Sequence, residues 1–441
     1  MQLSHSSYLK LAAPFILASA TTPILGAVGT AVVGRLGNAR YIGAVALGAV
    51  IFSTIYWLFN FLRLITSSYS SQAAGRGDQL DAALALFRPA VIALTAGVMI
   101  IAFSPFIARG ALWILAPEKP VEELVLVYFR TLIWGAPFVL LSFVMIGWLM
   151  GQMRLKAVMF LQVATNLFNC ILCCIFVFIL KMSVDGVALA TLLAQLASFA
   201  AGAALTLRYA RFDWRAVSLK LVLQKQGFKD LMSTNFYLMI RTVCMLIMVN
   251  IFMARSTSFG AVTLAANSIL FQLQYIMGDV FDGLSSASSV YSGLAVGGRD
   301  AKLFWDDLRI SGLWAAVFAI VMTMVYQAAD GFILGLFTDL PDVLAMAQEF
   351  SIYITVFPPL AAAGIVYYGI FNGALKTRMI CWSMLLTLGA FLAAERLLLP
   401  AFGNTGLWLA FLVFYIGRSG FLLMFLPALL RKLGFSRATL G

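Results

Sequence analysis

The chain has 441 residues, of which 62% are hydrophobic and only 11% are charged, and its mean hydropathy is +0.97. About a quarter of the residues of a soluble globular domain are charged, so this composition excludes that class and indicates an integral membrane protein. We attribute the net charge of +12 to loop lysines and arginines that face anionic membrane lipids, and we expect no nucleic-acid partner.

Twelve stretches of the chain are apolar and long enough to span a membrane, which takes about 20 apolar residues. In chain order they are 11–33, 42–66, 86–108, 122–150, 155–180, 186–208, 230–254, 260–290, 308–328, 346–372, 380–400 and 405–430. The basic, partly amphipathic segment 209–229 separates six spans from six and is expected to lie on the membrane surface. The sequence therefore predicts an all-α membrane protein with two six-helix lobes, residues 1–215 and 216–441.

The two halves repeat one another at a spacing of about 220 residues. Gly147 and Gly151 recur as Gly369 and Gly373, with basic residues following in both copies. The other repeated segments are Pro137 with Pro359, Gly43–Leu47 with Gly260–Leu264, Tyr69–Asp78 with Tyr291–Asp300, and Gly186–Ala190 with Gly406–Ala410. In polytopic membrane proteins such duplication is typical of secondary transporters, whose two bundles face a central cavity.

Loop charges predict the orientation of the chain, because cytoplasmic loops retain lysine and arginine. The N-terminus, the even-numbered loops and the C-terminus carry most of the basic residues, such as Arg154, Lys156 and Lys376. We therefore expect both termini in the cytoplasm and the protein in the cell (inner) membrane. Each half has an even number of spans, so the repeats should be parallel copies. The long first span, with no small-residue cleavage site, argues against a cleaved signal peptide.

Cysteine and histidine usage argues against metal or redox chemistry. Cys170, Cys173 and Cys174 lie within the fifth predicted span, where we expect them to be small packing residues, and the only histidine is His5. A metal-dependent membrane enzyme would need His, Asp or Glu clustered near a membrane face, and the sequence has no such cluster. We therefore expect no enzymatic activity, no metal and no cofactor.

Motifs along the whole chain carry a family resemblance. They are Thr30–Gly34, Phe61–Gly75, Gly147–Gly151, Gly186–Thr191, Asp282–Asp300, and Leu407–Ala410 with Arg418. Together, and in register with the internal repeat, they resemble the multidrug and toxic compound extrusion (MATE) transporters, specifically the DNA-damage-inducible (DinF-like) branch. The resemblance implies two six-helix lobes in a V, and export of bulky cationic or amphiphilic compounds in exchange for protons or sodium.

The chain departs from this branch at two acidic positions. The first span of the branch usually reads Val-Asp-Thr-Ala-Val, whereas Gly29 stands at the acidic position here. The fifth span usually carries Asn-x-x-x-Asp, whereas this chain has Asn169 followed by Cys173. The resemblance would name these two aspartates as the proton site of the N-terminal lobe, so that site lacks both of its carboxylates.

The remaining carboxylates of interest lie in the eighth predicted span. Asp279 and Asp282 are three residues apart and adjoin on one helical face. A paired carboxylate in a low-dielectric cavity can titrate near neutral pH, so we assign proton coupling to Asp282, assisted by Asp279. The alternative is that Asp282 is a structural partner of Arg241 or Arg63.

Polar residues inside other spans are candidates for the substrate cavity, because a buried amide needs a partner or a wet surface. The predicted cavity residues are Asn166, Asn169, Asn235, Arg241, Gly29 and Cys173. For Asn166 and Asn169, a hydrogen bond between helices of one lobe is an equal alternative.

Three functions compete at this level. The first is a monomeric secondary exporter that exchanges lipophilic cations for protons, or less favourably for sodium, within membrane lipid. The second is a lipid-linked precursor flippase of the same superfamily, which would need a more cationic cavity. The third is a coupling-deficient relative or a deliberately altered protein, as Gly29 and Cys173 suggest.

Overall fold

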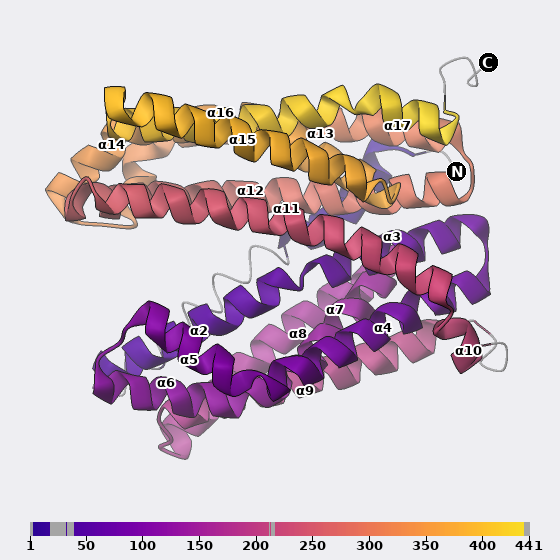
Figure 1. Cartoon of the computed structure of the whole chain (residues 1–441), viewed down its shortest axis with the longest axis horizontal. Helices are drawn as coiled ribbons and strands as arrows, with labels where there is room; N and C mark the ends of the chain where they lie inside the picture. The colour runs from indigo at the N-terminus through magenta and orange to yellow at the C-terminus, as the bar shows by residue number, and fades with distance from the viewer. Residues whose placement is uncertain (1–2, 18–31, 33–38, 211, 213–216, 436–441) are drawn as a thin grey trace. The chain divides into compact units, whose positions relative to one another are not determined.

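The computed structural model describes residues 3–17, 32, 39–210, 212 and 217–435, and the regular structure of these residues is helical (Figure 1). Ten helices of this described part are long and apolar enough to span a membrane. The first predicted span, 11–33, lies largely outside the described residues. Helix α12 (Ala261–Gly297) is not among the ten, although its 37 residues exceed what a bilayer requires.

Contacts between residues divide the chain into two compact units. Unit 2, residues 17–232, holds the helices of the first half. They are α2 (Ala39–Leu58), α3 (Phe61–Arg76), α4 (Gln79–Ala102), α5 (Ser104–Leu115), α6 (Lys119–Leu132), α7 (Ala136–Gly151), α8 (Leu155–Cys174), α9 (Val184–Tyr209) and α10 (Leu219–Val222). A short 3-10 turn joins α6 to α7, and a π-helical turn ends α8.

Unit 1 comprises residues 1–16 and 233–441. Besides α12, it contains most of α11 (Lys225–Thr257), and α13 (Ala301–Gly335), α14 (Pro341–Gly373), α15 (Thr377–Phe402), α16 (Asn404–Met424) and α17 (Leu426–Leu433). The first sixteen residues thus group with the second half, whereas the start of α11 groups with the first half. The division of the chain into lobes 1–215 and 216–441 stays a prediction. The contact units differ from it, because residues 1–16 belong to unit 1 and residues 216–232 belong to unit 2.

The predicted spans from 42–66 onward fall on helices, but most of these helices extend beyond the predicted ends, as α13 (Ala301–Gly335) does for the span 308–328. The spans 42–66 and 86–108 each cover a break between two helices. The apolar runs are long because each must cross the bilayer, and the polar residues between them end and start helices. Asp78 caps α4 by accepting hydrogen bonds from the backbone amides of Leu80 and Asp81. At the repeated position, Asp300 caps α13 by accepting from Leu303. A capping carboxylate satisfies amides that a helix start leaves without partners.

Gly147, Gly151, Gly369 and Gly373 lie at close contacts between helices. A Cβ atom added to any of them would collide with a backbone carbonyl oxygen of the neighbouring helix. The pairs are Gly147 with Arg63 and Gly151 with Ser67 between α7 and α3, and Gly369 with Ser285 and Gly373 with Ser289 between α14 and α12. Both members of each pair recur at an offset of 222 residues, so the duplication extends from sequence to packing.

A hydrogen bond from a serine side chain to a backbone carbonyl oxygen links each of these helix pairs. Ser70 of α3 donates to the carbonyl oxygen of Trp148 at 2.9 Å. Ser292 of α12 donates to the carbonyl oxygen of Ile370 at 2.8 Å. Inside a membrane, close approach at small residues and hydrogen bonds between helices provide the attraction, because lipid tails are as apolar as the helices.

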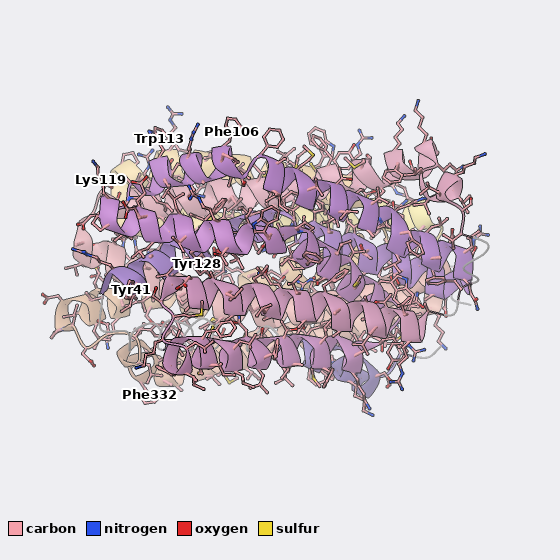
Figure 2. The ribbon with its side chains drawn as sticks, turned by 90° about the horizontal axis from the view of Figure 1, so that it is seen from below. Tyr41, Phe106, Trp113, Lys119, Tyr128 and Phe332 are labelled. Carbon is pink, nitrogen blue, oxygen red and sulfur yellow. The ribbon has the colours of Figure 1, made fainter. Side chains whose placement is uncertain are left out.

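The outer surface of unit 2 carries exposed aromatic side chains. Figure 2 labels Phe106 and Trp113 on α5, and these side chains are 67% and 83% exposed. In unit 1, Phe332 is 72% exposed. Such exposure would favour aggregation in water, but it suits contact with lipid and the membrane interface.

We expect Gly369→Ala to lower the free energy of unfolding of the detergent-solubilised protein by about 1–3 kcal/mol, and so to lower its melting temperature. The reason is that the added methyl group meets backbone atoms, which cannot rotate away. Gly389→Ala is the matched control, since no described atom lies within 4 Å of a Cβ atom there. A melting temperature unchanged by Gly369→Ala would contradict the close packing of α14 on α12.

Candidate functional site

The two predicted coupling carboxylates lie on α12 within unit 1. Asp282 is exposed and Asp279 is half-buried. Asp282 interacts electrostatically with Arg418 and Tyr415 of α16, and Asp279 interacts with Tyr275 on its own helix. The two carboxylates therefore lie near one another on α12, and Asp282 also interacts with side chains of α16.

Arg418 and Tyr415, which interact with Asp282, belong to a larger group of cations, tyrosines and an amide in unit 1. We call the group the polar cluster: Gln274 and Asp282 on α12, Arg241 on α11, Tyr368 on α14, and Tyr415 and Arg418 on α16. The guanidinium carbon of Arg241 lies 4.2 Å from the centre of the Tyr368 ring, and that of Arg418 lies 5.9 Å from the centre of the Tyr415 ring. Gln274 donates to the Tyr415 hydroxyl at 3.0 Å. Rings and polar groups compensate guanidinium groups that are removed from water.

Arg418 is a cation of the same unit that interacts electrostatically with Asp282. Arg418 is only 7% exposed, and it interacts electrostatically with both Asp282 and Arg241. The alternative that Arg63, a residue of unit 2, is the structural partner of Asp282 stays a prediction. The sequence placed Arg418 in a family motif, but it did not indicate that Gln274 and Tyr415 complete the cluster.

Asn235 is buried on α11, with 5% of its surface exposed. Neither its amide nitrogen nor its amide oxygen has a hydrogen-bond partner. A buried amide without partners is costly, so this residue is suited to a polar ligand or to water. Its place in the predicted substrate cavity stays a prediction.

The altered acidic position of the fifth span lies in unit 2. Cys173 is buried on α8, and its thiol donates to the amide oxygen of Asn169 at 3.3 Å. It also interacts electrostatically with Tyr128 of α6, which Figure 2 labels. Asn166, one turn earlier on α8, is half-buried and also has an interaction partner. The geometry expected of an amide and a carboxylate one turn apart is thus present, with a neutral thiol in place of the acid.

The remaining predicted position, Gly29, lies outside the described residues. Asn166, Asn169 and Cys173 belong to unit 2, whereas Asn235, Arg241, Asp279 and Asp282 belong to unit 1. Within the described part of the chain, no group of three or more His, Cys, Asp or Glu residues could hold a metal ion.

The sequence matches a family model along both halves. The model named MatE matches residues 14–175 and 238–393. The chain belongs to the MATE family. DNA damage-inducible protein F of Escherichia coli K12 is 30% identical over 93% of this chain and 89% of its own length. The Rhizobium meliloti protein described as "Probable multidrug resistance protein NorM" is 25% identical over 92% of this chain and 89% of its own length.

Solved structures agree on the fold. The chain matches the MATE transporter VcmN of Vibrio cholerae in its bent form with a TM-score of 0.86, covering 98% of this chain and 99% of that one at 17% identity. A second MATE structure in a bent conformation matches with a TM-score of 0.87, at 19% identity over 97% of this chain and 96% of that one. The predicted resemblance, the helical MATE fold and the assignment as a multi-pass membrane transporter rather than an enzyme are therefore confirmed.

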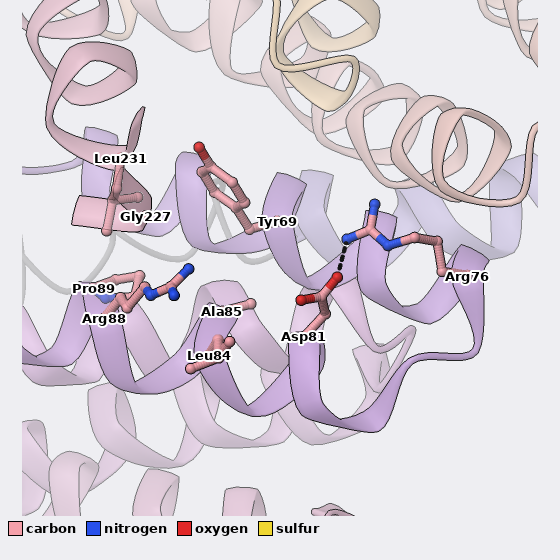
Figure 3. A pocket seen from close by; sticks show the side chains of 9 residues that line it. All are labelled: Tyr69, Arg76, Asp81, Leu84, Ala85, Arg88, Pro89, Gly227 and Leu231. Carbon is pink, nitrogen blue, oxygen red and sulfur yellow. Dashed lines mark hydrogen bonds and ion pairs between the residues drawn. The ribbon is translucent and has the colours of Figure 1, made fainter. Parts of the chain in front are cut away.

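This MATE chain also has a pocket of about 190 Å³ in unit 2, shown in Figure 3. It is lined by Tyr69, Arg76, Asp81, Leu84, Ala85, Arg88, Pro89, Gly227 and Leu231. Arg76 and Asp81 form an ion pair at 2.8 Å, drawn as a dashed line in Figure 3. Arg88 donates to the carbonyl oxygens of Leu221 and Val222, at 3.1 Å and 3.3 Å, at the end of α10. Arg88 therefore links α4 to α10, which lies in the segment between the two halves.

We expect Arg88→Leu to release α10, because the variant lacks both hydrogen bonds from the guanidinium group to the α10 carbonyls. Trypsin cleavage after Lys220 or Lys225 should then become about tenfold faster. Arg76→Leu is the control, since it removes only an exposed ion pair on the same pocket. Equal cleavage rates in the two variants would show that Arg88 does not hold the segment.

Proposed function

We propose that this MATE transporter is a secondary active multidrug exporter that moves lipophilic cations out of the cell in exchange for protons. The family supports the reaction class, and the name of the Rhizobium meliloti relative, a probable multidrug resistance protein, supports the substrate class. The abundance of aromatic and apolar side chains over fixed charges in the spans supports lipophilic compounds.

The interaction of Asp282 with Arg418 is the observation that supports the coupling proposal. Arg418 is a buried cation, and it interacts in turn with Arg241. When Asp282 is ionised, its negative charge offsets these cations and allows a positively charged compound to approach. When Asp282 takes up a proton, the cluster becomes more positive and repels that compound. Proton and cationic substrate would then exclude one another, which is the requirement for antiport.

The residues proposed to contact the substrate are Asn166, Asn169 and Cys173 in unit 2, and Asn235 and Arg241 in unit 1. Gly29 is proposed as a further substrate-contacting residue. The unpartnered amide of Asn235 supports a polar contact there. The neutral pair of Asn169 and Cys173 supports a cavity wall that binds without titrating.

The lipid-linked precursor flippase is the second candidate, and one observation favours it. Arg241 and Arg418 lie in one cluster, and Arg418 is buried, so the cluster could attract the phosphate groups of such a lipid. Asp282 and the rings of Tyr368 and Tyr415 offset that positive charge, which favours the exporter.

The orientation belongs to the same proposal. Both termini are assigned to the cytoplasm of a monomer in the inner membrane, because the basic residues are concentrated in the N-terminus, the even-numbered loops and the C-terminus. Export then means movement away from the side that holds both termini.

Cells that express the protein should accumulate less ethidium or rhodamine dye than cells with an empty vector, because lipophilic cations are the proposed substrates. Dissipating the proton gradient with an uncoupler should abolish the difference, whereas replacing sodium by choline should not. Equal dye accumulation at good membrane expression would refute the exporter. Loss of the difference in choline alone would assign the coupling to sodium.

Asp282→Asn should abolish gradient-driven dye efflux while dye binding to the purified protein changes little, because the amide keeps the size of the side chain but cannot exchange a proton. Asp342→Asn is the control, since Asp342 is an exposed carboxylate in the first turn of α14. Normal efflux by Asp282→Asn would exclude coupling through this carboxylate.

Restoring the carboxylates that the family usually carries should have the opposite effect. Gly29→Asp combined with Cys173→Asp should increase the dependence of dye efflux on the pH gradient, because each substitution adds a titratable group at an acidic position of the branch. No change in the double variant, together with normal efflux by Asp282→Asn, would favour a sodium-driven or non-transporting protein.

A further inference from the structure

The N-terminal helix, residues 5–17, is attached to the second half of the chain by tyrosines. Tyr8 is fully buried; its hydroxyl donates to the carbonyl oxygen of Leu284 at 2.9 Å and lies 2.8 Å from the Ser288 hydroxyl. The Tyr291 hydroxyl donates to the carbonyl oxygen of Ser7 at 3.2 Å. The rings of Tyr8 and Tyr291 stack with their centres 6.3 Å apart. This helix therefore covers part of α12.

A carboxyl group is buried beneath this contact. Asp307, in the second turn of α13, has no exposed surface. Neither of its carboxyl oxygens has a hydrogen-bond partner. The phenol groups of Tyr8, Tyr291 and Tyr367 lie close enough to interact with it electrostatically. These three residues come from the N-terminal helix, α12 and α14, so Asp307 lies where four helices meet.

No neighbouring group in the described part of the chain neutralises Asp307. The groups that face it from the packed helices are the three phenols, whose hydroxyls are engaged with Leu284 and Ser288, with Ser7, and with Leu308. On α13 itself, Asp306 is half-buried and Arg309 is exposed. An ionised carboxylate without a partner cannot be kept out of water at tolerable cost, so the buried group must carry a proton or a bound cation.

A metal cation does not fit this location. Hard cations require about six oxygen ligands, whereas Asp307 supplies two and the adjacent phenol oxygens are already hydrogen-bonded. Within the described residues, no group of potential metal ligands includes it. A proton needs only the carboxyl group.

The internal repeat indicates that the fold does not require an acid here. Asp307 lies seven residues after the capping residue Asp300, and Ala85 lies seven residues after Asp78. Tyr291 likewise corresponds to Tyr69. In unit 2, Tyr69 and Ala85 line the pocket of about 190 Å³ shown in Figure 3. The same helix pair thus forms with alanine at this position, and the carboxyl group is specific to the second half.

We propose that Asp307 is a proton-binding site, and that its protonation keeps the N-terminal helix packed on α12 and α13. Loss of the proton at alkaline pH places a negative charge under the helix, and the carboxylate can regain water only if residues 5–16 move away. The N-terminal helix then responds to the pH on its own side of the membrane. The site is distinct from Asp282 and depends on neither the substrate nor the coupling ion.

Infrared difference spectroscopy of the purified protein tests the protonation directly. At neutral pH, the spectrum of the wild type minus that of Asp307→Asn should show the C=O stretching band of a protonated carboxylic acid. The control variant Asp306→Asn should retain that band. Bands of an ionised carboxylate in the difference spectrum would overturn the proposal, and this measurement involves no transport.

Hydrogen exchange of residues 5–16 tests the consequence. After correction for intrinsic exchange, the opening equilibrium of the wild type and of Asp306→Asn should rise with pH by up to about tenfold per unit, as proton linkage requires. In Asp307→Asn it should not change with pH. Asp307→Ala, which copies the residue of the other repeat, gives the same expectation if the amide variant folds poorly. Identical pH dependence in all variants, or opening controlled by sodium in place of pH, would refute the site.

Discussion

Close backbone contact at the repeated glycines is the constraint on which the rest of the structure depends. Within lipid there is no hydrophobic driving force for apolar helices to associate. Van der Waals contact and hydrogen bonds between helices must therefore hold each unit together. Gly147 and Gly369 let α7 and α14 approach the backbones of α3 and α12. Because α12 is held against α14, the tyrosines, serines and carboxylates of α12 acquire fixed neighbours.

Those fixed neighbours explain how the second half tolerates buried charge. Arg418 on α16 is almost fully buried, and it depends on Tyr415 and on Asp282 for compensation. Arg241 depends on the face of the Tyr368 ring in the same way. The cations and the carboxylate come from three different helices, so the electrostatic balance of the cluster exists only when those helices are packed together. This makes the cluster a suitable place to link proton uptake to helix movement.

The two halves share a scaffold and differ in polar content. The first half carries Cys173 and Ala85, neither of which is an acid, and two hydrogen bonds from Arg88 to the linking segment. The second half carries Asp282 and Asp307. Duplication preserved the contacts between helix backbones, whereas the two carboxyl groups proposed to bind protons both lie in the second copy. Proton-dependent behaviour is accordingly proposed for the second half.

The sequence by itself determined the membrane class, the span positions from 42–66 onward, the internal repeat and the MATE family. Span length, apolar composition and glycine spacing are local properties, and they act through the bilayer in the same way wherever the helices finally pack. The sequence also placed Asn169 and Cys173 on one face of a helix, because their spacing is one turn. Only the tertiary structure decided that Gln274 and Tyr415 join Arg418, that residues 1–16 group with the second half, and that Asp307 is buried without a partner. Burial and pairing depend on residues far apart in the chain, and no local pattern of residues encodes them.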